Sequence, residues 1–162
     1  MERYDCSLWD FLKNETKYLI TPEERYDITV EIIEVVIFLQ SNKICHRDLK
    51  PSNILLRTKK LPNGQEEILL NQWVLTDFGL ASRMANLSGS NGTPGFASME
   101  QFVGKSHEKS DNYSMAKLAV LILFKWNVAW NLLARPIPVT DNFSYLQFEI
   151  ITTLSELLTV IS

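Results

Sequence analysis

Two short stretches of the chain carry the side chains best suited to chemistry. In the first, residues 46–53, the carboxylate of Asp48 is followed by the cation of Lys50 and the amide of Asn53. In the second, residues 77–79, Asp77 follows a β-rich run. Carboxylate and amide oxygens are the ligands that Mg²⁺ takes in proteins, and a lysine places a positive charge beside an anion. The alternative is that residues 46–48 are polar members of an ordinary turn.

Three ordered stretches resemble the motifs of a eukaryotic-type serine/threonine protein kinase domain. Residues 46–53 read HRDLKPSN and are similar to the kinase catalytic loop, and residues 77–79 read DFG, the metal-binding triplet. Residues 92–100 read GTPGFASME and resemble the end of the activation segment, with SME in place of APE. All of these motifs belong to the large (C-terminal) lobe of a kinase.

The resemblance implies a role for each polar residue. Phosphoryl transfer asks a protein mainly for positioning and charge neutralisation. Asp48 is expected to orient the substrate hydroxyl and accept its proton, and Lys50 to place a cation near the transferred phosphate. Asn53 and Asp77 are expected to hold the Mg²⁺ of Mg-ATP. Leu55 is expected to lie under the adenine ring, although a plain strand-core role fits it equally.

The same resemblance indicates the acceptor. The sequence DLKP at residues 48–51 is similar to that of serine/threonine kinases, and Thr93 fits the same branch by contacting the catalytic Asp48 and Lys50. A protein substrate with a serine or threonine acceptor is therefore expected. The alternative is a kinase-like binding module that docks partners and performs no catalysis.

Two further positions imply structural support. Asp111 resembles the aspartate at the start of the long central helix, which accepts hydrogen bonds from the catalytic-loop backbone. His46 is expected to be a packed residue that supports Phe78, with no acid or base role. An ordinary acidic residue at a helix N-terminus is the alternative for Asp111.

Regulation by phosphorylation is a hypothesis based on Arg47. A phosphate on Ser88 or Ser90 could pair with Arg47 and order the activation segment; mass spectrometry of the cellular protein would test this. In the family, Glu100 pairs with an arginine late in the large lobe. The only arginine after Glu100 is Arg135, which stands too early for that role.

The expected fold is α+β and mainly α-helical: a kinase-like large lobe with a small β-hairpin carrying the catalytic loop. The clearest local signal is a capping box from Thr21 to Glu24, with proline at the first helical position. The expected segments are a hinge and first helix (1–14), a buried helix (22–42), the catalytic loop and a strand (44–60), an insertion (61–72), the metal-binding motif and activation segment (73–100), a central helix (110–133) and a terminal helix (143–161).

The small lobe of a kinase is not recognisable in the sequence. None of the six glycines is spaced as a phosphate-covering loop, and the resemblance begins at the hinge. A truncated chain that needs a small lobe as its partner is expected, with little or no activity alone, because an open, wet site weakens electrostatic catalysis.

The bulk composition excludes other classes of protein. The chain has 162 residues, 46% hydrophobic, and a net charge of −3 without a basic stripe, so nucleic acid is not an expected partner. Polar residues interrupt the apolar stretch 118–133, so no membrane insertion is expected. Cys6 and Cys45 have no metal-ligand spacing and are expected to be reduced thiols in an intracellular, cytoplasmic protein.

Overall fold

A computed structural model of the chain describes residues 4–106 and 110–124. The expected terminal helix at 143–161, and the part of the central helix from residue 125 onward, lie outside these residues. The described α-helices are α1 (Leu8–Lys13), α2 (Pro22–Ser41), α3 (Met99–Phe102) and α4 (Ser110–Leu123), and the short 3₁₀ helices are η1 (Pro51–Asn53), η2 (Phe78–Leu80) and η3 (Met84–Asn86). The strands are β1 (Cys6–Ser7), β2 (Tyr18–Leu19), β3 (Ile44–Cys45), β4 (Ile54–Lys60), β5 (Glu66–Leu75) and β6 (Ser82–Arg83).

Helix α2 begins at the capping box expected from the sequence. The backbone N–H of Glu24 donates to Thr21 Oγ1 at 3.1 Å, and the backbone N–H of Thr21 donates to Glu24 Oε2 at 2.7 Å. These two bonds satisfy amides that the first helical turn leaves without partners. The helix runs from Pro22 to Ser41 with Asn42 as its C-cap, so it begins where the capping box predicts and ends one residue before the expected bound of 42.

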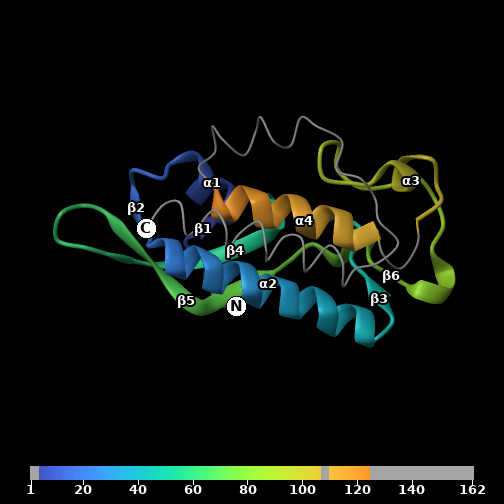
Figure 1. Cartoon of the computed structure of the whole chain (residues 1–162), viewed down its shortest axis with the longest axis horizontal. Helices are drawn as coiled ribbons and strands as arrows, with labels where there is room; N and C mark the ends of the chain where they lie inside the picture. Colours follow the sequence, from blue (N-terminus) through green and yellow to red (C-terminus); the bar gives the residue numbers. More distant parts are fainter. Residues whose placement is uncertain (1–3, 107–109, 125–162) are drawn as a thin grey trace.

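The hydrophobic core lies between α2 and α4, which run side by side (Figure 1). The guanidinium of Arg25 on α2 donates to the carbonyl of Ile122 on α4 at 2.9 Å and ties the two helices together. The core side chains are buried and come from both helices, from α1 and from the sheet. They include Leu8, Phe11, Leu12, Ile28, Ile32, Val36, Ile54, Leu56, Leu118, Leu121 and Ile122.

The expected β-hairpin is part of a larger sheet. Strands β4 and β5 pair antiparallel, and the short strands β1 and β2 add at the two edges, giving the order β1-β4-β5-β2. Strand β3 precedes the catalytic loop in the sequence and β6 follows it, and the two strands pair as a second, two-stranded sheet. The described fold is therefore mixed α/β, and its sheet is larger than the one small hairpin that was expected.

The segment expected as an insertion, 61–72, contains the hairpin turn and a β-bulge. Leu56 pairs with Trp73 and Thr58 pairs with Ile68, so residues 69–72 of β5 lie opposite a single residue, Arg57, of β4. Just after the bulge, the indole N–H of Trp73 donates to Glu31 Oε2 of α2 at 2.6 Å. This bond joins the part of β5 that follows the segment to α2.

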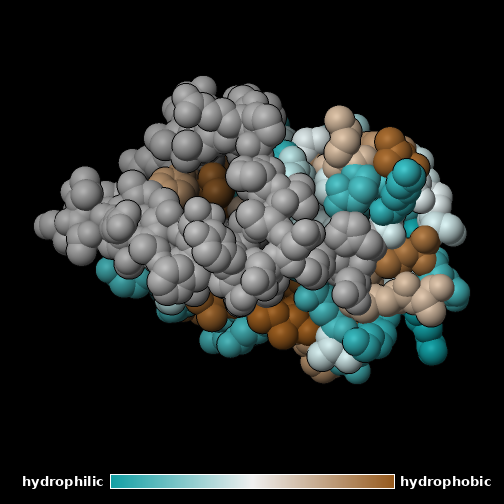
Figure 2. Space-filling view, turned by 45° about the vertical axis from the view of Figure 1, so that its right-hand side comes forward, coloured by the Kyte–Doolittle hydropathy of each residue, from teal (hydrophilic) through white to brown (hydrophobic). Residues whose placement is uncertain are grey.

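The described surface has scattered apolar residues. Phe38 on α2 is 65% exposed, and Met99 at the start of α3 is 77% exposed. Figure 2 shows such apolar spots separated by hydrophilic surface. Phe38 has Ile37 as an exposed neighbour, and Met99 is followed by the exposed Phe102 and Val103. Small exposed apolar groups are common on protein surfaces. In the two described segments, no helix is long and apolar enough to cross a membrane, and Cys6 and Cys45 are not joined in a disulfide.

Candidate active site

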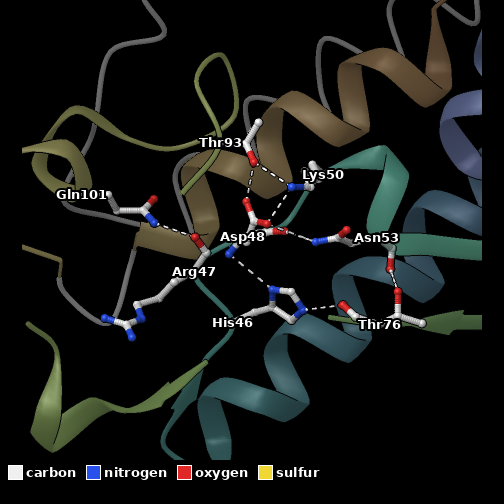
Figure 3. A network of polar contacts seen from close by, with 8 residues as sticks. All are labelled: His46, Arg47, Asp48, Lys50, Asn53, Thr76, Thr93 and Gln101. Atoms are coloured by element: carbon white, nitrogen blue, oxygen red, sulfur yellow. Dashed lines mark hydrogen bonds and ion pairs between the residues drawn. The ribbon is translucent and has the colours of Figure 1, made fainter. Parts of the chain in front are cut away.

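The loop between β3 and η1 brings Asp48 to the centre of a polar network (Figure 3). The Thr93 hydroxyl donates to Asp48 Oδ1 at 2.6 Å. The Lys50 ammonium donates to Asp48 Oδ2 at 2.7 Å and to Thr93 Oγ1 at 2.8 Å. The three side chains therefore form a closed triangle, in which the carboxylate is 7% exposed and the lysine side chain 22% exposed.

The charge state of Asp48 follows from this environment. Partial burial raises the pKa of Asp48, but the hydrogen bonds from Lys50 and Thr93 and the charge of Lys50 outweigh burial and lower the pKa below its usual value. Asp48 is therefore an anion at neutral pH. An ammonium group has three N–H donors, and Lys50 uses two of them here. One donor remains for a further anion.

Asn53 lies beside the triangle at the end of η1. Its side-chain amide nitrogen donates to the Asp48 carbonyl at 3.0 Å and to Asp48 Oδ2 at 3.3 Å. Since the nitrogen is used in this way, the side-chain oxygen is the atom of Asn53 that a cation could contact. The fit to Mg²⁺ is one of donor type, because Mg²⁺ takes amide and carboxylate oxygens.

Asp77 is held at the same end of the sheet by hydrogen bonds from its neighbour, Thr76. The backbone N–H of Thr76 donates to the Asn53 carbonyl at 2.8 Å, and the Thr76 hydroxyl donates to the same oxygen at 3.1 Å. The next residue, Asp77, is exposed and has a left-handed backbone with φ of 61°. No hydrogen bond or ion pair joins its carboxylate to residues 4–106 or 110–124, so Asp48 and Asn53 converge whereas Asp77 is only held nearby.

The ring of His46 contacts the backbone of the site through both of its nitrogens. The backbone N–H of Asp48 donates to His46 Nδ1 at 3.3 Å, so the ring proton is on Nε2, which donates to the Thr76 carbonyl at 3.0 Å. The ring of Phe78 contacts the His46 ring edge-on, with the two centroids 4.7 Å apart. The packing of His46 against Phe78 that the sequence predicted is present.

Asp111 holds the loop from α4. It is 1% exposed, and its carboxylate accepts the backbone N–H groups of His46 at 2.6 Å and Arg47 at 2.8 Å. Burial raises the pKa of Asp111, against the lowering effect of these two donors. The contact expected from the kinase resemblance is present in this geometry.

Arg47 crosses from the loop to the activation segment. Its guanidinium donates to the carbonyls of Leu80 at 2.6 Å and Ser88 at 2.9 Å. The hydroxyl of Ser90 donates to the Phe102 carbonyl at 2.6 Å. Arg47 therefore already contacts the segment that holds the candidate phosphorylation sites.

Two expected site residues have simpler surroundings. Leu55 is half-buried on β4, paired with Ser7 of β1 and Val74 of β5, which is compatible with a core role. Glu100 is half-buried on α3, and its expected distant partner, Arg135, lies outside the described residues. The adenine-binding role of Leu55 and the ion pair of Glu100 stay predictions.

One buried site residue was missed at the sequence level. Gln101 is fully buried on α3 and contacts the catalytic loop at Arg47. The spacing of Ser98 and Gln101 matches the S-x-x-Q form of a capping box, which was a usable local signal. That signal predicts a helix start, however, and says nothing about a contact with a residue more than fifty positions away.

Comparisons with known proteins identify the family of this chain. The family model described as the protein kinase domain matches residues 1–136. The serine/threonine-protein kinase PknA of Nostoc sp. is 33% identical over 107 residues, covering 60% of this chain and 17% of that protein. A probable serine/threonine-protein kinase of Dictyostelium discoideum is 29% identical over 135 residues, covering 77% of this chain and 19% of that protein.

A solved structure gives the same result for the fold. A crystal structure of a kinase domain superposes with a TM-score of 0.60 at 21% identity, covering 88% of this chain and 44% of that chain. The chain belongs to the protein kinase domain family. It spans less than a fifth of the length of the curated relatives it matches.

Proposed function

We propose that this site transfers the γ-phosphate of ATP to a serine or threonine hydroxyl of a protein. The observation that carries the proposal is the closed triangle of Asp48, Lys50 and Thr93. The matched relatives PknA of Nostoc sp. and serine/threonine-protein kinase C of Synechocystis sp. support the choice of acceptor by their names.

Each residue of the triangle has one task in this reaction. A carboxylate has about four lone-pair positions, so Asp48 retains room to accept the hydrogen bond of a substrate hydroxyl. Because the pKa of Asp48 is lowered, it is a weak base that orients the hydroxyl and takes its proton as the bond to phosphorus forms. The remaining donor of Lys50 faces the charge of the transferred phosphate, and Thr93 fixes both partners.

The side chains of Asn53 and Asp77 offer the donor types that Mg²⁺ takes. Asn53 and Asp77 are the residues that would hold Mg²⁺, which neutralises charge on the phosphates when bound. In the described residues no three His, Cys, Asp or Glu side chains form a metal-binding group. Two protein donors are enough for Mg²⁺, because it keeps several waters and takes phosphate oxygens as further ligands.

The described elements correspond, in this proposal, to the large lobe of a kinase. The chain covers 44% of the kinase domain structure that it superposes on, and the catalytic loop lies between α2 and the β4–β5 hairpin. A small lobe would cover the nucleotide and exclude water, which strengthens the charge interactions of Lys50 and Asp77.

Phosphate transfer by the full-length gene product tests the proposal. With radiolabelled ATP and a mixed peptide library, label is expected on serine or threonine. Asp48→Asn removes the proton acceptor and is expected to lower kcat about 10²–10⁴-fold. Asp27→Asn, which changes an exposed aspartate on α2, is the matched control and should leave kcat unchanged. Label on tyrosine alone, or equal rates for Asp48→Asn and wild type, would refute the proposal in favour of another acceptor or a binding module.

A further inference from the structure

The side chain of Gln101 is a fully hydrogen-bonded polar group beside the catalytic loop. It is fully buried on α3. Its nitrogen donates to the Arg47 carbonyl at 2.9 Å and to Asn91 Oδ1 at 3.4 Å. Its oxygen accepts the backbone N–H of Ser98 at 3.1 Å and the Ser98 hydroxyl at 3.3 Å. The amide therefore uses both donors and both lone pairs.

The two ends of this amide serve different elements. The oxygen end is local, because Ser98 is the N-cap of α3 and the bond completes a capping box. The nitrogen end is long-range, because it joins α3 to Arg47 of the catalytic loop (Figure 3) and to Asn91 of the activation segment. A residue needed only to start the helix would have no use for the second set of bonds.

The bond to Arg47 holds a conformation that is otherwise unfavourable. Arg47 has φ of 66°, in the left-handed region that costs a residue with a side chain about 1–2 kcal/mol. Asp111 accepts the N–H of Arg47, and Gln101 donates to its carbonyl. The backbone of Arg47, immediately before Asp48, is thus hydrogen-bonded at its N–H by a residue of α4 and at its carbonyl by a residue of α3.

Space around Gln101 is also closely filled. A Cβ atom placed on Gly92 would lie 3.2 Å from Gln101 Nε2 and 3.2 Å from the Arg47 carbonyl oxygen. Gly92 immediately precedes Thr93, whose hydroxyl donates to Asp48. A shift of Gln101 would therefore be transmitted to both segments that contact the Asp48 carboxylate.

We propose that Gln101 is a positioning residue that clamps the activation segment to the catalytic loop and so sets the orientation of Asp48. The proposal rests on the proposed kinase function for its effect on turnover. The clamp itself is a property of the folded chain and can be measured without activity.

Two substitutions separate the clamp from the helix cap. Gln101→Glu keeps an oxygen for Ser98 but replaces the donor to Arg47, so an ionised carboxylate would face two acceptor oxygens. When protonated, the same carboxyl can donate again to the Arg47 carbonyl. Gln101→Met has similar length and loses the hydrogen bonds at both ends at every pH. Gln72→Glu, at an exposed position of β5, is the matched control.

The first measurement is amide hydrogen exchange in peptides covering 46–53 and 88–97, as a ratio to wild type at each pH. At about pH 8, Gln101→Glu is expected to increase exchange about tenfold, since a buried acceptor loses its donor. Lowering the pH should bring the ratio back toward one, because burial raises the pKa of a glutamate and the protonated carboxyl donates again. The ratio for Gln101→Met should stay high and flat, and that for Gln72→Glu should stay near one.

The second measurement is turnover by the full-length protein. Gln101→Glu should lower kcat about tenfold at about pH 8 with little change in KM for ATP, because Gln101 is argued to act through Asp48. Wild-type exchange in Gln101→Met, which has no donor to Arg47 at any pH, would overturn the clamp. Absence of phosphate transfer in wild type, with the exchange pattern as expected, would overturn the kinase proposal and leave the clamp standing.

Discussion

Two buried aspartates of the site have pKa values shifted in opposite directions. Asp48 has an ammonium group 2.7 Å from its carboxylate, and the pKa of Asp48 is lowered despite burial. Asp111 is more deeply buried, and its contacts with the loop are hydrogen bonds from two backbone N–H groups. The pKa of Asp111 is raised. Partial charges on amides offset burial less than a full charge does. The chemistry proposed for Asp48 therefore depends on Lys50.

Replacing Lys50 should raise the pKa of Asp48. Lys50→Met removes both the hydrogen bond and the positive charge that lower this pKa, while burial, which raises it, remains. The Asp48 carboxyl carbon, followed by NMR in the metal-free protein, should titrate at higher pH than in wild type. Lys59→Met, at an exposed position of β4, is the control. An unchanged or lower Asp48 pKa in Lys50→Met would contradict the assigned cause.

At the scale of elements, local signals predicted the structure well and pairing between distant segments did not follow from them. The capping box at Thr21 and the turn at 62–64 are set by neighbouring residues. The edge strands β1 and β2 have two residues each and exist because β4 and β5 lie beside them. The bulge at 69–72 likewise depends on the register with β4, which the sequence of β5 alone does not specify.

The site residues also fall into those that the local sequence predicts and those that depend on contacts between distant segments. Residue types and order identified Asp48, Lys50, Asn53 and Thr93, and the structure brings these four together. The grip of Gln101 on Arg47 joins residues from two unrelated stretches of chain. Its geometry arises only when α3 packs on the loop, so no local pattern encodes it.

Gly92 provides a test of how tightly the activation segment packs on the loop. Its φ is +94°, and a Cβ atom there would lie 2.5 Å from the Cβ of Ala97. Gly64 in the hairpin turn has φ of +84° but open space around the same position. Both alanine variants carry the left-handed penalty of about 1–2 kcal/mol. Gly92→Ala adds a clash of about 1–3 kcal/mol.

Urea unfolding of the two variants measures the difference. Gly92→Ala is expected to be less stable than Gly64→Ala by about 1–3 kcal/mol, because the backbone term is shared and cancels. Equal losses of stability for the two variants would show that the 92–97 segment yields to the added methyl group. The described packing of that segment against Ala97 and Arg47 would then be wrong.

At the scale of the whole molecule, α4 links the hydrophobic core to the polar site. Leu118, Leu121 and Ile122 of this helix are buried in the core. At its N-terminal end, Asp111 holds the catalytic loop, and farther along Ser114 donates to the Phe96 carbonyl at 2.8 Å. Unfolding of the core must therefore release the loop, so the titration of Asp111 and Asp48 should be visible in global stability.

The two aspartates should change the free energy of unfolding on opposite sides of their common ordinary pKa of 3.8. The folded-state pKa of Asp111 is raised, so its contribution is full below 3.8 and is lost as the pH rises through the folded pKa. The folded-state pKa of Asp48 is lowered, so its contribution is full above 3.8 and is lost as the pH falls through the folded pKa.

Urea unfolding at a series of pH values, for wild type, Asp111→Asn and Asp48→Asn, separates the two terms. The stability of wild type relative to Asp111→Asn should fall as the pH rises above 3.8. Its stability relative to Asp48→Asn should fall as the pH drops below 3.8. A wild-type advantage over Asp111→Asn that grows with rising pH would mean that the two backbone N–H donors outweigh burial. Asp111 would then hold the loop as a stabilised carboxylate, and the opposite assignment made for it would be wrong.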